Sequence, residues 1–197
     1  MRRITSLHTR SPKLTWTMHP SKSEIRSHLK TLLRENRPYS EEQSLQLCRE
    51  IQKHPHWIAA KTVALFAPLP GEPNLLHLCP SSGKQLFFPK IFDHNLLWLR
   101  VEDTKTQLSR SSNGTKHLLE PITQTSTKIS ELHLILVPGL AFTKSGHRLG
   151  RGGGFYDRAL SQRTLGTRVI GVCFDFQVRE TLPTEPHDQT VDGLFYV

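Results

Sequence analysis

Long apolar runs are absent from this sequence, and cysteine is scarce. No run approaches the roughly 18 residues that a transmembrane helix needs, and no apolar segment near the first residue is typical of a secretory signal. The three cysteines, Cys48, Cys79 and Cys173, are widely spaced and form no CxxC pair. This spacing argues against a disulfide framework and against a cysteine zinc site. We expect reduced, buried thiols, a cytoplasmic location and no contact with a membrane.

Acidic residues are outnumbered, 17 against 26 basic ones, which gives a formal net charge of +9. Such an excess favours anionic partners, among them phosphates, polycarboxylates and nucleic acids. Residues 1–17 carry four of the 26 basic side chains and none of the 17 acidic ones, so the remaining chain has a net charge of only +5. That bias is weak compared with the dense basic stripe of a nucleic-acid-binding domain.

Residues 1–17 differ in composition from the rest of the chain. They are rich in Arg, Ser and Thr, as transit peptides are, but their apolar residues form no helical stripe and Met18 follows directly. We interpret them as a disordered leader or as the product of a start assigned upstream of Met18, with organellar targeting as the alternative. Residues 18–197 are expected to form one domain, because 36% hydrophobic and 22% charged residues are typical of a globular chain.

Hydrophobic patterning predicts an α/β fold. Helical spacing favours helices over 22–36 and from Ser40 to Ile51, with the pair His54-Pro55 ending the second. Apolar runs predict strands at 62–67, 85–91, 95–101, 133–142 and 167–174 and at the C-terminus, a short helix at 73–79 and a helix at 155–163. Residues 102–130 are weakly patterned, which predicts an irregular connection. Continuously apolar strands separated by helices indicate a three-layer sandwich with a mainly parallel central sheet flanked by helices.

In such folds, ligands bind outside the carboxyl ends of the strands. The loops after Ala67, Val137 and Phe174 are therefore the places where we expect a site. The chain after Val137 contains GHRLGRGGGFYDR, residues 146–158, with five glycines and three arginines. Because ordered glycine costs conformational entropy, such a cluster indicates a tight turn or the close approach of a ligand to the backbone.

This glycine-rich segment does not match the standard nucleotide-binding loops. The Walker pattern fails, and GxGxxG fails because Phe155 occupies the third glycine position. A strand, a glycine loop and a helix start nevertheless aim backbone N–H groups at one point, which favours phosphate binding. Arg148 and Arg151 add guanidinium groups suited to phosphate oxygens. Asp157 is either a Mg²⁺ ligand or an acid that stabilises the start of the helix.

The order of more than twenty residues around this loop makes the pattern specific. VPGLAFTKSGHRLGRGGGFYDR resembles the C-terminal motif of the 5-formyltetrahydrofolate cyclo-ligase family, in which a strand ends in Pro-Gly and Gly-x-Arg-Leu-Gly-x-Gly-x-Gly-Tyr-Tyr-Asp follows. KSEIR, LLEP, FDFQ and PHDQTVD resemble further motifs of the family, so the likeness extends from about Lys22 to the end of the chain. Thr143 stands where the family usually has Asp, Phe155 replaces the first Tyr, and Gly153 occupies a position that is Lys or Gly.

The resemblance implies ATP- and Mg²⁺-dependent conversion of 5-formyltetrahydrofolate to 5,10-methenyltetrahydrofolate, with release of ADP and phosphate. The formyl oxygen would take the γ-phosphoryl group, with Arg148 and Arg151 acting on the developing charge, and the bridge nitrogen would then close the ring. ATP would contact Lys22, Arg26, Arg148, Leu149, Gly150, Arg151, Gly152, Gly153, Gly154, Phe155 and Tyr156. Folate, with or without a polyglutamate tail, would contact Ala67, Glu72, Arg151, Gly152, Gly153, Gly154 and Phe155. Asp157 and Asp188 would bind Mg²⁺.

Two other functions are compatible with parts of the sequence. An α/β protein that binds sugar or nucleoside phosphates would use the glycine loop but would need neither Lys22 and Arg26 nor Glu72. A nucleic-acid-binding module would use the positive charge but would leave Asp157 and Asp188 without a role. The histidines show no metal-ligand spacing such as HExxH, and we interpret them as structural or solvated. We therefore expect a monomeric enzyme that acts on small molecules and binds no nucleic acid.

Overall fold

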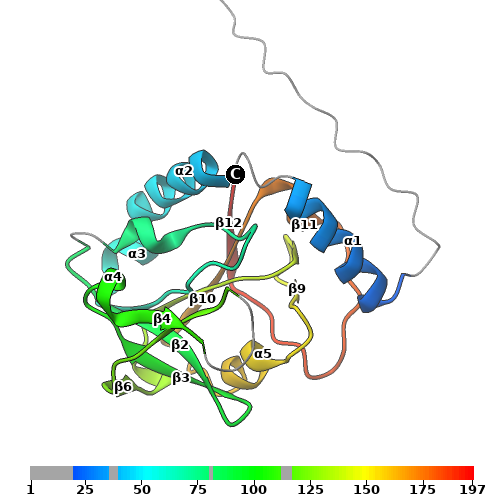
Figure 1. Ribbon diagram of the computed structural model, residues 1–197. Helices are drawn as coiled ribbons and strands as arrows, with labels where there is room; N and C mark the ends of the chain where they lie inside the picture. The colour runs from blue at the N-terminus through cyan, green and yellow to red at the C-terminus, as the bar shows by residue number, and fades with distance from the viewer. Residues whose placement is uncertain (1–19, 36–39, 80–81, 112–116) are drawn as a thin grey trace, which may run out of the picture.

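The computed structural model describes residues 20–35, 40–79, 82–111 and 117–197, and Figure 1 shows how their helices flank a central sheet. The leader, residues 1–17, lies outside this part of the chain, so the prediction for it stays a prediction. No described helix has the length and apolar content to cross a membrane.

The central sheet has seven strands in the order β12-β10-β7-β1-β2-β3-β6. The first five of these pair in parallel, whereas β3 and β6 run antiparallel to their neighbours. The sheet comprises β1 (Thr62–Ala64), β2 (Gln85–Phe92), β3 (Asn95–Arg100), β6 (Ser126–Thr127), β7 (Leu134–Val137), β10 (Arg168–Cys173) and β12 (Gly193–Tyr196). The predicted mainly parallel α/β fold is confirmed.

The strands bury both faces, because alternate residues point to opposite sides of a strand. In β7, Leu134 and Leu136 pack with α2 (Ser40–Lys53), α3 (Pro55–Ala59) and the 3₁₀ helix η2 (Leu75–Leu78). Ile135 and Val137 pack on the other face with α5 (Phe155–Leu160) and η3 (Ile129–Glu131). This arrangement gives the three layers that the sequence predicts.

Helix α1 (Lys22–Glu35) belongs to neither layer and packs on a small second sheet (Figure 1). That sheet contains β8 (Ala141–Thr143), β9 (Arg148–Leu149) and β11 (Val178–Arg179). Ile25, Leu29 and Leu33 bury the apolar face of α1 against Leu140, Ala141 and Leu149. Ser21 caps the helix, because its hydroxyl accepts the Glu24 N–H while the Glu24 carboxylate accepts the Ser21 N–H.

Several boundaries differ from the prediction, chiefly near proline. The strand predicted at 133–142 is divided at Pro138 into β7 and β8, because proline donates no ladder hydrogen bond. The strand predicted at 62–67 is assigned only as β1, Thr62–Ala64. The second helix ends before His54 as predicted, but Pro55 then begins α3, a position where proline is well tolerated.

Residues 102–130 were predicted to be irregular, and this prediction is wrong in part. They contain the short helix α4 (Thr104–Gln107), the hairpin strands β4 (Leu108–Arg110) and β5 (Leu119–Pro121), strand β6 and the start of η3. The elements are short and amphipathic patterning is weak within them, which is why the sequence signal is poor. Residues 112–116 lie outside the described part.

All three cysteines carry free thiols, as expected. Cys48 and Cys173 are buried and Cys79 is partly buried. Burial raises the pKa of each thiol to about 12, so the reactive thiolate is disfavoured at neutral pH.

Candidate functional site

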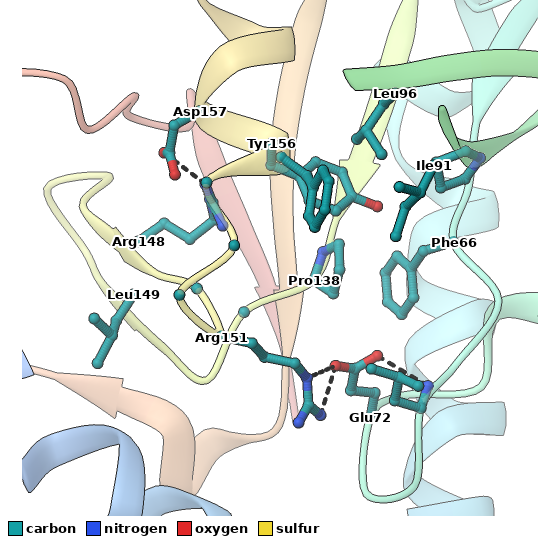
Figure 2. A pocket seen from close by; sticks show the side chains of 18 of the residues that line it. Phe66, Glu72, Ile91, Leu96, Pro138, Arg148, Leu149, Arg151, Tyr156 and Asp157 are labelled. Carbon is teal, nitrogen blue, oxygen red and sulfur yellow. Dashed lines mark hydrogen bonds and ion pairs between the residues drawn. The ribbon is translucent and has the colours of Figure 1, made fainter. Parts of the chain in front are cut away.

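A cavity of about 520 Å³ lies at the carboxyl ends of β1 and β7 (Figure 2). This is the edge of the sheet where two of the three expected loops meet. Every site residue proposed from the sequence lines it: Lys22, Arg26, Ala67, Glu72, Arg148, Leu149, Gly150, Arg151, Gly152, Gly153, Gly154, Phe155, Tyr156, Asp157 and Asp188. The chain thus brings residues from its first helix, its middle and its last loop to one place.

The glycine loop between β9 and α5 forms one wall of the cavity. Gly152 has φ +109° and Gly154 has φ +65°, backbone angles that residues other than glycine rarely adopt. Gly154 is the N-cap of α5, which has six residues and is shorter than the predicted 155–163. Arg26 of α1 donates from Nε to the carbonyl of Gly150 at 3.0 Å, so the first helix braces the loop.

Arg148 and Asp157 form an ion pair at the two ends of this loop (Figure 2). Nη2 of Arg148 lies 2.7 Å from Oδ1 of Asp157, and their side chains are only 3% and 17% exposed. The guanidinium group also packs 5.6 Å from the centre of the Tyr156 ring. Oδ1 of Asp157 further accepts the backbone N–H of Gln189 at 3.2 Å. The pair therefore fastens the loop and joins it to the C-terminal segment.

Arg151 and Glu72 form a second ion pair that crosses the cavity (Figure 2). Oε1 of Glu72 accepts from Nε of Arg151 at 2.9 Å and from Nη2 at 2.8 Å. Oε2 of Glu72 accepts the N–H of Leu69 at 3.0 Å, which fixes the carboxylate after β1. Glu72, which the sequence assigned to folate, is thus in direct contact with Arg151, which the sequence assigned to both ATP and folate.

Lys22 ties the first helix to the C-terminal loop. Its Nζ lies 2.6 Å from Asp188 and 3.1 Å from Glu185. Burial alone would lower the pKa of the Lys22 ammonium, but hydrogen bonds to Asp188 and Glu185 outweigh it and raise that pKa. Burial likewise works to raise the pKa of Asp188, and the bonds from Lys22 and from the Glu185 backbone overcome it and lower that pKa. Both groups are therefore charged at neutral pH.

Acidic side chains at this end of the cavity suit a hard cation. Ligand atoms of Glu185, His187 and Asp188 lie within 4.8 Å of one another. Asp157 is outside that group, but it accepts the N–H of Gln189, the residue next to Asp188. Carboxylate oxygens are the donors that Mg²⁺ prefers, so the residues present fit this ion. Glu185 and His187 were missed because a single acid and a single histidine in a loop give no spacing signal.

The opposite wall of the cavity is apolar. Phe66, Ile91, Leu96, Pro138 and Tyr156 project toward one another in Figure 2. Burial, with a contribution from Glu72, raises the pKa of the Tyr156 hydroxyl, so it stays protonated. The β2–β3 hairpin supplies Ile91 and Leu96, which sequence reasoning did not single out, because apolar strand residues look alike whether they face a core or a ligand.

Glu120 is a buried acid in the same cavity that the sequence analysis noted only as part of LLEP. Its side chain comes from β5, the residue is 5% exposed, and Oε1 accepts the N–H of Ile91 at 2.9 Å. A buried carboxylate flanked by Leu118 and Leu119 is unusual enough to indicate a role in the site.

Two residues from the family motifs have structural contacts. Gln177 is fully buried and donates to the carbonyls of Gly139 and Leu140 at 2.8 and 3.2 Å, which shapes the turn after β7. Thr143 accepts the N–H of His147 at 3.0 Å with its hydroxyl, a bond that an Asp carboxylate makes equally well. The Thr143 departure therefore preserves the turn that leads into the glycine loop.

Comparison with known proteins gives a consistent result. The model of the 5-formyltetrahydrofolate cyclo-ligase family matches residues 18–197. The 5-formyltetrahydrofolate cyclo-ligase of Mus musculus is 25% identical over 187 residues, which cover 89% of this chain and 91% of that protein. The Haemophilus influenzae protein of the same name is 33% identical over 138 residues, 66% of this chain and 72% of that one. The NMR structure of Aquifex aeolicus 5,10-methenyltetrahydrofolate synthetase superposes with a TM-score of 0.78 at 30% identity, covering 89% of both chains.

Proposed function

Because the chain belongs to the 5-formyltetrahydrofolate cyclo-ligase family and is an enzyme of that class, we propose that it closes the 5-formyltetrahydrofolate ring at the expense of ATP, with Mg²⁺. The products are 5,10-methenyltetrahydrofolate, ADP and phosphate. The observation that carries this proposal is the contact between Arg151 and Glu72. The contact supports the proposal because it joins a guanidinium group suited to phosphate oxygens and a carboxylate suited to the amino-pyrimidine edge of a pterin.

In this reaction the protein mainly positions two substrates and neutralises the negative charge of the phosphates. The formyl oxygen attacks the γ-phosphorus of ATP, ADP leaves, and the formyl carbon becomes electrophilic. The bridge nitrogen N10 then attacks that carbon, and phosphate departs. Asp157 and Asp188 would hold Mg²⁺, which would supply positive charge to neutralise the phosphates.

The basic wall binds ATP, and the apolar wall binds the folate ring. Arg151 and the backbone amides from Gly150 to Gly154 face the triphosphate, and Lys22 and Arg26 complete this wall from α1. Phe66, Ile91 and Tyr156 pack on the flat pterin and exclude water from the reacting atoms. The convergence of Lys22, Arg26 and Glu72 on one cavity favours the cyclo-ligase over a general sugar-phosphate protein, which needs none of the three.

The decisive assay follows the near-ultraviolet absorbance of the methenyl product. We expect purified protein to convert 5-formyltetrahydrofolate only when both ATP and Mg²⁺ are present, and omission of either to abolish turnover. Chelation by EDTA should stop the reaction, and added Mg²⁺ should restore it. Folded protein that shows no turnover under complete conditions refutes the proposal.

A further inference from the structure

Glu120 differs from the other described acidic groups of the cavity, each of which has a basic partner. Arg148, Arg151 and Lys22 each have an acidic partner, and Glu72, Asp157 and Asp188 are the acids that neutralise them. In the described part of the chain, Glu120 forms no ion pair with any Lys, Arg or His, and the Ile91 N–H is its one side-chain hydrogen bond. Among the described residues it is therefore a buried carboxylate without a counter-ion.

Such a charge is costly unless something else compensates it. A carboxylate in an apolar environment loses its hydration, and a single neutral hydrogen bond replaces only part of it. The surroundings of Glu120 offer little more, since Pro89, Leu118 and Leu119 line the same end of the cavity. The cations gather at the other end, around the glycine loop. Within the described part of the chain the cavity is thus polarised, with basic groups at one wall and a carboxylate without an ion pair at the other.

The reaction under the proposed function produces the missing counter-charge. Attack by N10 forms a bond to the formyl carbon, the bond from that carbon to the phosphate oxygen breaks, and the N10 proton passes to the departing phosphate. The ring that remains is an amidinium, with one positive charge shared between N5 and N10. The substrate ring, by contrast, is a neutral amide. A positive charge therefore develops within the folate while the reaction proceeds.

We propose that Glu120 stabilises this developing positive charge, and so acts as a charge-stabilising residue of ring closure. This inference rests on the proposed function and assigns Glu120 a role separate from those of Glu72 and the magnesium ligands. A fixed charge in a site from which water is excluded acts more strongly than one in solvent, and it needs no reorganisation during the reaction. The Ile91 N–H orients the carboxylate without neutralising it.

The test is Glu120→Gln, which keeps the oxygen that accepts the Ile91 N–H and removes only the charge. We expect kcat to fall about 10²-fold, with KM for ATP and for 5-formyltetrahydrofolate changed by less than about threefold, because the neutral ring is bound before charge develops. The matched control is Glu102→Gln, an exposed acid paired with Arg100, which should leave kcat unchanged. Unchanged kcat in Glu120→Gln, or a rise in KM alone, overturns the proposal.

Ligand binding provides a readout that does not depend on turnover. The methenyl product and the formyl substrate share the same anionic tail, so the ratio of their dissociation constants isolates the charge of the ring. We expect Glu120→Gln to weaken product binding at least tenfold relative to substrate binding, measured by fluorescence at mildly acidic pH. An unchanged ratio overturns the proposal. If wild-type protein binds both ligands but does not turn over, the proposed function fails while this measurement still decides the role of Glu120.

Glu120→Asp covers the case in which the glutamine variant does not fold. The shorter side chain keeps a carboxylate but withdraws it from the ring, so we expect a smaller loss of kcat and a shift of the ligand ratio in the same direction. A wild-type ratio together with a wild-type kcat in Glu120→Asp contradicts the proposal.

Discussion

Two arginine–carboxylate pairs lie within the same cavity, and they differ in the exposure of the arginine and in the distance along the chain between the two partners. Arg148 and Asp157 are nine residues apart, and both side chains are well buried. Arg151 and Glu72 are 79 residues apart, and the arginine is 35% exposed. The first pair closes a loop on itself, whereas the second joins two walls across the space that a ligand must occupy.

The difference in burial separates a pair that holds the site together from a pair that a ligand can reach. Arg148 is enclosed by Asp157 and the Tyr156 ring, so releasing it would expose a buried charge. Arg151 can exchange its carboxylate for phosphate oxygens at little cost, because solvent already reaches it. We infer that the first pair stays closed throughout the reaction and that substrate opens the second.

The largest expected effect is on folding, from Arg148→Met. Removing the guanidinium leaves the carboxylate of Asp157 mostly buried without a cation, which should lower the free energy of unfolding by about 3 kcal/mol. Urea denaturation followed by circular dichroism measures this loss.

Arg163→Met is the matched control for that experiment. Arg163 pairs with Asp192 at 3.2 Å, and both side chains are about a quarter exposed. Its removal should cost at most about 1 kcal/mol, as is usual for accessible pairs. Equal losses in the two variants would contradict a structural distinction between the pairs.

Arg151→Ala should slow the chemical step of the reaction. Under the proposed function this guanidinium neutralises the transferring phosphoryl group, so its loss is expected to lower kcat about 10²-fold. Glu72→Ala should instead raise KM for 5-formyltetrahydrofolate and leave KM for ATP nearly unchanged. Steady-state kinetics with each substrate varied in turn distinguishes the two. If Arg151→Ala changes only the KM for 5-formyltetrahydrofolate, Arg151 positions Glu72 for folate binding and does not act on the phosphate.

The smallest effect concerns the third pair, Lys22 and Asp188, and its dependence on pH. The pKa of Asp188 is below its ordinary value of 3.8, so its contribution is complete above that value and is lost as pH falls through the folded-state pKa. The pKa of Lys22 is above its ordinary value of 10.5, so its contribution is complete below that value and is lost as pH rises further.

We therefore expect the difference in unfolding free energy between wild type and Lys22→Met to be flat from about pH 5 to about pH 9, at about 1 kcal/mol. Urea unfolding at a series of pH values tests this. A steady slope near neutral pH would contradict this assignment of the contact to Lys22 and Asp188.

Much of the fold followed from continuous apolar patterns. Strands such as Leu134–Val137 and Arg168–Cys173 are buried on both faces, and that environment leaves a clear signature in sequence. Elements of two to four residues left none, because neither helical nor strand periodicity develops over such lengths. The division at Pro138 was also missed, although proline there marks the end of β7.

The site was predictable where residues carry distinctive chemistry. Glycines, arginines and acids in the order found at 146–158 identified one wall, and all of its proposed residues line the cavity. The pairing among them was not predictable, because contacts such as Arg151 to Glu72 depend on the packing of distant segments. Ile91 and Leu96 of the opposite wall were missed for a related reason, since they have no property that separates a ligand contact from a core contact.

The bond between Lys22 and Asp188 joins residues 166 positions apart. During synthesis α1 leaves the ribosome long before the loop that holds Asp188. The bond between Lys22 and Asp188 therefore cannot form until almost the whole chain has been made. The cavity is consequently among the last features to assemble, so a nascent chain can acquire most of its sheet while the walls of the cavity are still incomplete.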